Sequence, residues 1–432
     1  MNNRNWLNTI RGLQIFQILR FSGFFLTGIL LARGPVTLQT IGVYESLMFI
    51  AGACSFFWVN GFLNSLLAAY PAHTEKGKYL FNVFLLLVCC SVIVFLSLKV
   101  AEPFLTTFLT KEALHYLPLF SYFILLNSPC FLIEYIYLLK EKSKHLLTYG
   151  IIVFFLTITF TVVPLYLGLG LIVSLQALVA LSIFKLLWLI RLIVKHTELK
   201  IESKYLSQHF YLAFPLVLSF LMSGSAEYID GLMVNHFFGA EMFAIFRYGA
   251  KEFPLSLLIA NALSTALIPI LSESGQLDKG MSLIKEKSRR LMHLLFPLSI
   301  LLLSLSNWFY PMVFNSHFSA SAPIFNTFLL LIICRLLFPQ SLIMALKKTK
   351  VILIISVIEI AVNVIASYLL MLQFGIIGIA YGTVLAFFVE KIILIFYLYK
   401  YQNILPWKYI PINTWSAYCL LLLLCYVFMQ VI

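Results

Sequence analysis

The chain has 432 residues, of which 62% are hydrophobic and only 11% are charged, and its formal net charge is +13. Soluble domains are usually about 45–50% apolar and about 25% charged, so this composition excludes a water-soluble fold and predicts an integral membrane protein. The basic residues lie in short runs between apolar segments. This pattern is typical of a topology signal facing anionic lipid headgroups, and it argues against nucleic acid as a partner.

Apolar segments long enough to cross a bilayer follow one another along the chain. A helix needs about 20 apolar residues to cross a hydrocarbon core of about 30 Å. Thirteen segments meet this requirement, near residues 13–33, 41–70, 79–100, 114–138, 146–166, 169–194, 209–236, 241–271, 291–314, 321–346, 351–371, 376–399 and 411–431. We therefore expect an all-α integral membrane fold with twelve core helices and a thirteenth, C-terminal helix. The thirteenth follows a loop at 400–410, and a peripheral helix is the alternative for it.

The charges of the loops indicate the orientation. If the N-terminus is cytoplasmic, twenty Lys and Arg residues fall in cytoplasmic loops, and three, Arg33, Lys99 and Lys111, fall on the other side. The bias follows the positive-inside rule. We expect a multi-pass protein with a cytoplasmic N-terminus.

An internal similarity divides the predicted helices into two halves. Residues 25–49 (FLTGILLARGPVTLQTIGVYESLMF) align with residues 228–253 (YIDGLMVNHFFGAEMFAIFRYGAKEF) at an offset of roughly 200 residues, an even number of helices apart. A parallel repeat of this kind predicts two pseudo-symmetric six-helix lobes with the substrate path between them; chance similarity of apolar strings is the alternative. The expected parts are an N-terminal lobe (1–195), a cytoplasmic linker (196–208), a C-terminal lobe (209–400) and the extra helix (401–432).

Basic residues inside the predicted spans mark the candidate site, because a charge at the bilayer centre costs about 2.5–3.5 kcal/mol on insertion scales. We predict that four deep residues line a cationic, substrate-binding cavity: Arg20, Arg247, Lys251 and Arg335. The alternative is structural pairing with acidic residues. Four other residues are assigned to helix ends and are expected to snorkel towards water: Lys185, Arg191, Glu390 and Lys391.

Acidic residues inside the spans are the candidate coupling residues or counter-ions. They are Glu45, Glu227, Asp230, Glu252 and Glu359. Glu227 and Asp230 are three residues apart and share a helix face, where paired carboxylates can bind a cation or share a proton.

Motifs for catalysis and for metal binding are absent from the sequence. It has no Walker A, HExxH or GxSxG motif and no loop large enough for a soluble catalytic domain. The seven cysteines lie in apolar segments without CxxC spacing or a neighbouring histidine cluster. We predict no enzymatic activity, no metal site and no cofactor.

Several segments together resemble the multidrug/oligosaccharidyl-lipid/polysaccharide (MOP) exporter superfamily. They are DGLMVNHFFG (230–239), FAIFRYGAKEFP (243–254), ALSTALIPILSES (262–274) and residues 362–387 with Gly375, Gly378 and Gly382. The likeness spans about residues 10–400 and is greatest to the polysaccharide (Wzx-type O-antigen) flippases.

This resemblance implies a flippase with a cationic central cavity in a bacterial inner membrane. Its substrate would be an undecaprenyl-pyrophosphate-linked oligosaccharide, such as the O-antigen repeat unit of a lipopolysaccharide, moved from the cytoplasmic to the periplasmic leaflet. Alternating access would be driven by a proton or sodium gradient or by the membrane potential, with a polysaccharide polymerase as a further partner. Two alternatives stay open: a lipid II flippase like MurJ, which Glu252–Pro254 (EFP) resembles, and a drug/cation antiporter of the MATE type.

Overall fold

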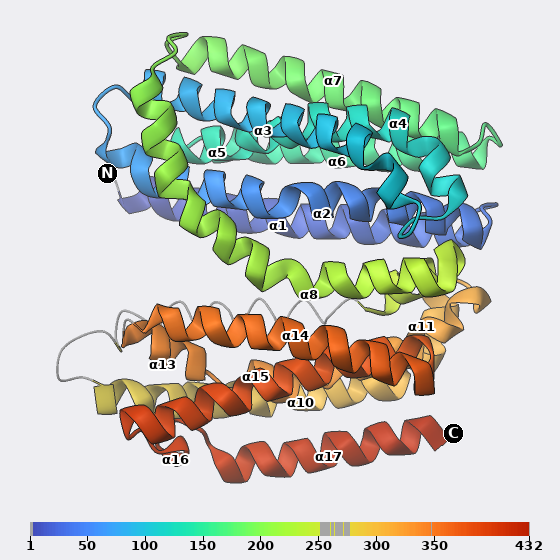
Figure 1. The fold of residues 1–432 in the computed structure, drawn as a ribbon, viewed down its shortest axis with the longest axis vertical. Coiled ribbons are helices and arrows are strands. Elements are labelled where there is room, and N and C mark those ends of the chain that lie inside the picture. The colour runs from blue at the N-terminus through green and yellow to red at the C-terminus, as the bar shows by residue number, and fades with distance from the viewer. Residues whose placement is uncertain are drawn as a thin grey trace. The chain divides into compact units, whose positions relative to one another are not determined.

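The computed structural model describes residues 3–250, 260, 263, 271, 277–346 and 348–431, and these residues contain helices and no strand (Figure 1). The α-helices are α1 (Asn3–Arg33), α2 (Leu38–Ala69), α3 (Lys76–Leu105), α4 (Lys111–Asn127), α5 (Leu132–Leu139), α6 (Ser143–Tyr166), α7 (Leu171–His196), α8 (Ser203–Gly249), α10 (Leu277–Val313), α11 (Ser321–Leu329), α12 (Ile332–Arg335), α13 (Pro339–Ala345), α14 (Thr349–Phe374), α15 (Ile376–Gln402), α16 (Pro406–Tyr409) and α17 (Ile412–Val431). Short 3-10 turns are η1 (Tyr70–Ala72), η2 (Ser128–Phe131) and η3 (Ser316–Ala320).

The predicted all-α membrane fold is confirmed. Within the described residues, 12 helical segments are long and apolar enough to cross a membrane. The C-terminal segment is one of them, and α17 packs along α10 (Figure 1). The predicted span 241–271 lies mostly outside the described residues, as do Lys251 and Glu252.

One predicted boundary agrees with the structure and one predicted helix differs from it. The helix α8 contains a break at Gly239, between the predicted spans 209–236 and 241–271, and the φ of 77° at Gly239 is in the region that favours glycine. The predicted span 321–346 is divided into α11, α12 and α13. Pro339 is the first residue of α13. Proline lacks the backbone donor and disfavours helical geometry at the preceding residue, so the helix ends before it and restarts.

Contacts divide the chain into two compact units. The first unit comprises Met1–Gly224 with Asn235–Ala244, and the second comprises Ser225–Val234 with Ile245–Ile432. Each has its own apolar core: the first is centred on residues such as Trp58, Phe62 and Leu189, and the second on residues such as Phe296, Leu342 and Leu422. The lobe and linker boundaries expected from the sequence stay a prediction.

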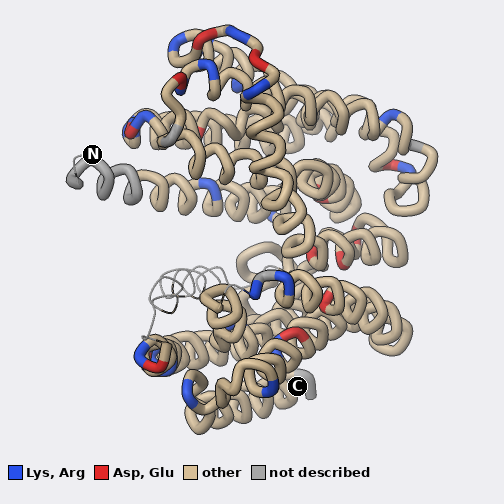
Figure 2. The backbone as a smooth tube through the Cα atoms, turned by 60° about the vertical axis from the view of Figure 1, so that its left-hand side comes forward, with Lys and Arg blue, Asp and Glu red and all other residues tan. Residues whose placement is uncertain are grey.

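Large apolar side chains also cover the outside of the helices. Exposed examples occur in both units, including Phe155 on α6, Leu187 on α7, Leu372 on α14 and Leu424 on α17. Lys, Arg, Asp and Glu lie mainly towards the helix ends and in loops, with long uncharged stretches between them (Figure 2). An apolar exterior with polar ends is the arrangement that a bilayer requires, and the protein is a multi-pass membrane protein.

Candidate functional site

The first unit holds a charged cluster around Arg20 of α1. The guanidinium forms an ion pair with Glu134 of α5 and lies 4.9 Å from the ring centroid of Phe16. The Glu134 side chain is 13% exposed and that of Arg20 is 31% exposed. Arg20 was predicted to line a cavity, and the structure gives it an acidic partner that the sequence analysis did not name.

A second cation belongs to the same cluster. The ammonium of Lys185 on α7 donates to the side-chain oxygen of Asn127 and interacts electrostatically with both Glu134 and Arg20. The prediction that Lys185 snorkels to water is wrong, because its head group is held by an amide well inside α7. Two cations and one carboxylate give this cluster a formal excess of one positive charge.

Arg247 in the second unit is paired with Glu227. Arg247 Nη1 lies 2.6 Å from Glu227 Oε1. The two residues are 20 positions apart, which would separate them by about 30 Å on a continuous helix. The break at Gly239 reverses the chain and brings them together. Glu227 is thus the counter-ion of Arg247, which was one of the residues predicted to line the cavity.

A further group of charges in the second unit lies around α15. Arg335 of α12 lies 4.7 Å from the ring centroid of Phe387. Lys391 Nζ lies 2.6 Å from Glu390 Oε2, and Glu359 interacts electrostatically with all three charged groups. The prediction that Glu390 and Lys391 snorkel is wrong, because they are only 5% and 8% exposed.

Asp230 lies in a neutral polar cluster instead of an ionic one. Its side chain is 1% exposed, and it accepts hydrogen bonds from Asn363 Nδ2 (3.3 Å) and from the hydroxyl of Thr383. Asn363 Nδ2 also lies 3.1 Å from Thr383 Oγ1, and Asn363 Oδ1 is buried without a hydrogen-bond partner. Asp230 has no ion-pair partner within the described residues. Burying a carboxylate without a cationic partner is costly, so the hydrogen bonds from Asn363 and Thr383 are the contacts that stabilise Asp230 among the described residues.

Glycines in the α14–α15 hairpin build this cluster. The two helices meet at Gly375, whose φ of 61° permits the tight reversal. A Cβ atom at Gly382 would lie 2.3 Å from the backbone nitrogen of Ser367. Only a glycine therefore allows α15 to approach α14 so closely, and this approach sets Thr383 beside Asn363.

Of the remaining predicted site residues, one is described by the structure and two are not. Glu45 of α2 is half-buried and forms no ion pair with any described residue. Lys251 and Glu252 lie outside the described residues. No group of three or more His, Cys, Asp or Glu in the described ranges is placed to hold a metal ion.

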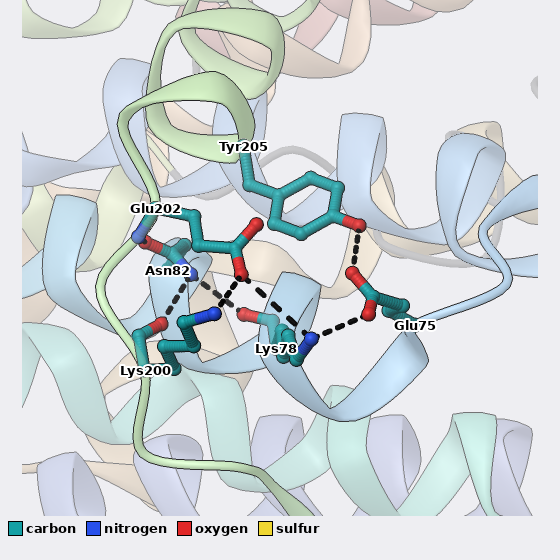
Figure 3. Close-up of polar contacts among 6 residues, drawn as sticks. All are labelled: Glu75, Lys78, Asn82, Lys200, Glu202 and Tyr205. Atoms are coloured by element: carbon teal, nitrogen blue, oxygen red, sulfur yellow. Dashed lines mark hydrogen bonds and ion pairs between the residues drawn. The ribbon is translucent and has the colours of Figure 1, made fainter.

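Asn82 is a polar residue that the sequence analysis missed, and it anchors the segment that follows α7 (Figure 3). Its Nδ2 donates to the carbonyl oxygens of Lys78 (2.8 Å) and Lys200 (3.0 Å), and its Oδ1 accepts from the backbone nitrogen of Glu202 (2.9 Å). The Asn82 side chain is fully buried. A single asparagine on an apolar helix gives no sequence signal for such a contact.

The same cluster continues to the α2–α3 loop. Tyr205 Oη donates to Glu75 Oε2 (2.7 Å), Lys78 forms an ion pair with Glu75, and Lys78 Nζ also lies 3.7 Å from Glu202 Oε1 (Figure 3). Hydrogen bonds from Lys78 and Tyr205 hold the pKa of Glu75 below its ordinary value of 4.5. Residues 200–205 are thus fixed to the start of α3 by charged and neutral contacts together.

Comparisons with known proteins agree with this architecture. A family described as polysaccharide biosynthesis protein matches residues 30–323. The chain is similar to the structure of the lipid II flippase MurJ in an inward closed conformation, with a TM-score of 0.73, 19% identity and coverage of 96% of this chain and 92% of that chain. It is also similar to an inward-facing multidrug resistance MATE family transporter of the MOP superfamily, with a TM-score of 0.64, 14% identity and coverage of 90% and 97%.

A further similar structure is a MOP superfamily transporter from Pyrococcus furiosus, described as having a binding pocket of reversed polarity. Its TM-score is 0.57 at 14% identity, with coverage of 91% of this chain and 94% of that chain. No curated protein sequence matches the chain. At these identities the likeness to solved structures shows the fold alone, and that fold is of the transporter type.

Proposed function

The chain belongs to the polysaccharide biosynthesis protein family of the MOP exporter superfamily, and from this membership we propose that it flips an undecaprenyl-pyrophosphate-linked oligosaccharide. The family and fold are of transporter and flippase types, not of catalytic enzymes. The substrate would be the repeat unit of an O-antigen or a related polysaccharide, moved from the cytoplasmic to the periplasmic leaflet of a bacterial inner membrane. A polymerase that consumes the flipped unit is the expected partner.

The observation that carries this proposal is the excess cationic charge inside the membrane. Arg20 and Lys185 share the single carboxylate of Glu134. A guanidinium binds phosphate oxygens through a planar fork, and an ammonium acts as a point charge. A pyrophosphate can neutralise the excess positive charge of this cluster while the ion pair between Arg20 and Glu134 stays intact. Arg247 and Arg335 of the second unit are proposed to act on the same substrate, together with Lys251, which lies outside the described residues.

The test is a flipping assay in proteoliposomes that contain the lipid-linked oligosaccharide. Its exposure to a membrane-impermeant lectin or glycosidase measures translocation. We expect flipping to fall at least tenfold in Arg20→Gln and in the double variant Arg247→Gln with Lys251→Gln. The control is Arg191→Gln, which removes a charge from an exposed position on α7. Full flipping by folded Arg20 and double variants would overturn the cationic-site proposal.

A second candidate substrate is lipid II, because the structure of a lipid II flippase covers 96% of this chain. Both substrates carry a prenyl tail and a pyrophosphate, so the same cationic groups serve either one. Parallel assays with lipid II and with a lipophilic cation dye distinguish between the three candidate substrates. Flipping of lipid II alone would replace the oligosaccharide proposal, and gradient-driven dye efflux would favour a MATE-type antiporter.

The coupling ion is proposed to bind at Asp230. Among the residues that the structure describes, the carboxyl is buried without a cationic partner, and two further oxygen atoms lie near it: Asn363 Oδ1, which accepts no hydrogen bond from a described residue, and the Thr383 hydroxyl. Oxygen ligands and a carboxylate suit Na⁺ as well as a proton. Flipping is measured under an imposed sodium or pH gradient in Asp230→Asn and Thr383→Val. We expect Asp230→Asn to flip at a rate that no longer responds to the coupling gradient. A retained response would assign coupling elsewhere.

A further inference from the structure

The helix α10 is longer than a membrane requires. Its 37 residues extend about 55 Å, whereas the hydrocarbon core is about 30 Å thick. All its Lys, Arg, Asp and Glu residues lie between Asp278 and Arg290, and none occurs from Leu291 to Val313. The apolar part accounts for the span, so the first third of α10 lies at or beyond the membrane surface.

A cavity of about 460 Å³ lies between this charged segment and the short helix α16. Lys285 Nζ donates to the carbonyl oxygen of Trp407 at 2.6 Å, which fixes α16 to α10. Trp407, directly after Pro406, is 54% exposed at the cavity. Tryptophan is enriched at the headgroup level of membranes, so its position agrees with the depth inferred from the length of α10.

The charges that line the cavity are only partly neutralised. Lys408 Nζ is 3.1 Å from Asp278 Oδ1, and Glu286 is paired with Arg290. Arg289 also lines the cavity and forms no ion pair with a described residue. Within the described ranges, Lys285 forms a hydrogen bond to a neutral carbonyl and no ion pair. The guanidinium of Arg289 and the ammonium of Lys285 therefore leave the cavity with a cationic lining.

We propose that this cavity binds the phosphate headgroup of an anionic phospholipid such as phosphatidylglycerol. Arg289 and Lys285 would contact the phosphate oxygens, and Trp407 would lie beside the glycerol and the start of the acyl chains. A guanidinium fork suits phosphate, and anionic leaflets attract basic groups at this depth. The inference needs only a membrane-embedded chain and is independent of the flipped substrate and of the orientation.

The test is native mass spectrometry of the purified protein with equal amounts of phosphatidylglycerol and phosphatidylcholine. The variant Arg289→Gln with Lys285→Gln removes the two cavity charges that are proposed to contact the phosphate. The control variant Lys279→Gln with Lys287→Gln removes two exposed charges of the same helix that do not line the cavity. We expect the preference for phosphatidylglycerol to fall about 30-fold in the cavity variant, equivalent to about 2 kcal/mol, and to stay near wild type in the control.

Two results would overturn the proposal. An equal loss of preference in both variants would mean that the net basic charge of the segment, and not the cavity, retains the lipid. Binding of soluble glycerol 3-phosphate as tightly as phosphatidylglycerol would mean that the ligand is a free phosphate. Thermal unfolding of each variant, measured beside the binding experiment, distinguishes loss of the site from loss of the fold.

Discussion

The ion pair between Arg20 and Glu134 is expected to stabilise the first unit and to act on the substrate, and a double-mutant cycle separates the two roles. Arg20→Gln leaves Glu134, which is 13% exposed, without its principal counter-ion. Removing one partner of a buried pair costs about 3–5 kcal/mol. We expect the lower end of that range, because Lys185 still attracts the carboxylate. Denaturation of the detergent-solubilised protein measures the change.

The double variant Arg20→Gln with Glu134→Gln is expected to lie within about 1 kcal/mol of wild type, because the one charge that remains in the cluster, Lys185, keeps its hydrogen bond to Asn127. With Glu134→Gln as the other single variant, the coupling energy of the cycle should then be at least about 2 kcal/mol. If the changes in unfolding free energy of the two single variants add up to that of the double variant, Arg20 and Glu134 do not stabilise each other. If the stable double variant does not flip substrate, the positive charge of Arg20 is needed for transport itself, and normal flipping would restrict Arg20 to a structural role.

Three further predictions concern the glycine contact and the polar cluster of Figure 3. Gly382→Val should destabilise the α14–α15 hairpin by about 1–3 kcal/mol in a thermal melt, because even a Cβ atom would lie 2.3 Å from the Ser367 nitrogen; an unchanged melt would contradict the close approach. Asn82→Ala should increase hydrogen exchange at the backbone amide of Glu202, since that N–H loses its acceptor; unchanged exchange would show that Asn82 is dispensable. The pKa of Glu75 in the folded protein is below its ordinary value of 4.5. The ionised carboxylate therefore helps to hold residues 200–205 against α3 at neutral pH, and this stabilisation is lost as the pH falls through the folded-state pKa. Limited proteolysis from roughly pH 6 to pH 3.5 should therefore accelerate in wild type and lose this acid dependence in Glu75→Gln.

The spanning helices were predictable because the bilayer imposes their length and composition. The position of deep arginines was also visible in the sequence, since any charge within an apolar run stands out. Their partners were not visible. Glu134 is 114 residues from Arg20, and neither position contains information about the other. Arg247 meets Glu227 only because Gly239 breaks α8.

The errors have a common physical origin. Lys185, Glu390 and Lys391 were assigned to helix ends by counting along the chain, but α15 continues to Gln402 and buries both of its residues. A long charged side chain snorkels only if no partner lies closer than the interface. Asn127 supplies such a partner for Lys185, and Glu390 and Lys391 supply each other. Whether a charged side chain reaches water therefore depends less on its distance from the helix end than on the polar groups that lie near it in the folded chain.

Two of the polar clusters within the spans differ in their electrostatics, and each suits one of the two tasks of the proposed flippase. The cluster of Arg20, Lys185 and Glu134 keeps an excess positive charge, so an anionic headgroup gains energy by entering it. Asp230 accepts hydrogen bonds from neutral donors and is repelled by the carboxylate of Glu227, so a proton or a sodium ion changes the net charge of its site by one unit. One charge moved through 100 mV yields about 2.3 kcal/mol. Since Thr383 contacts Asp230 directly and its helix approaches α14 closely at Gly382, occupancy of this site would act on the packing of the hairpin without any intermediate element.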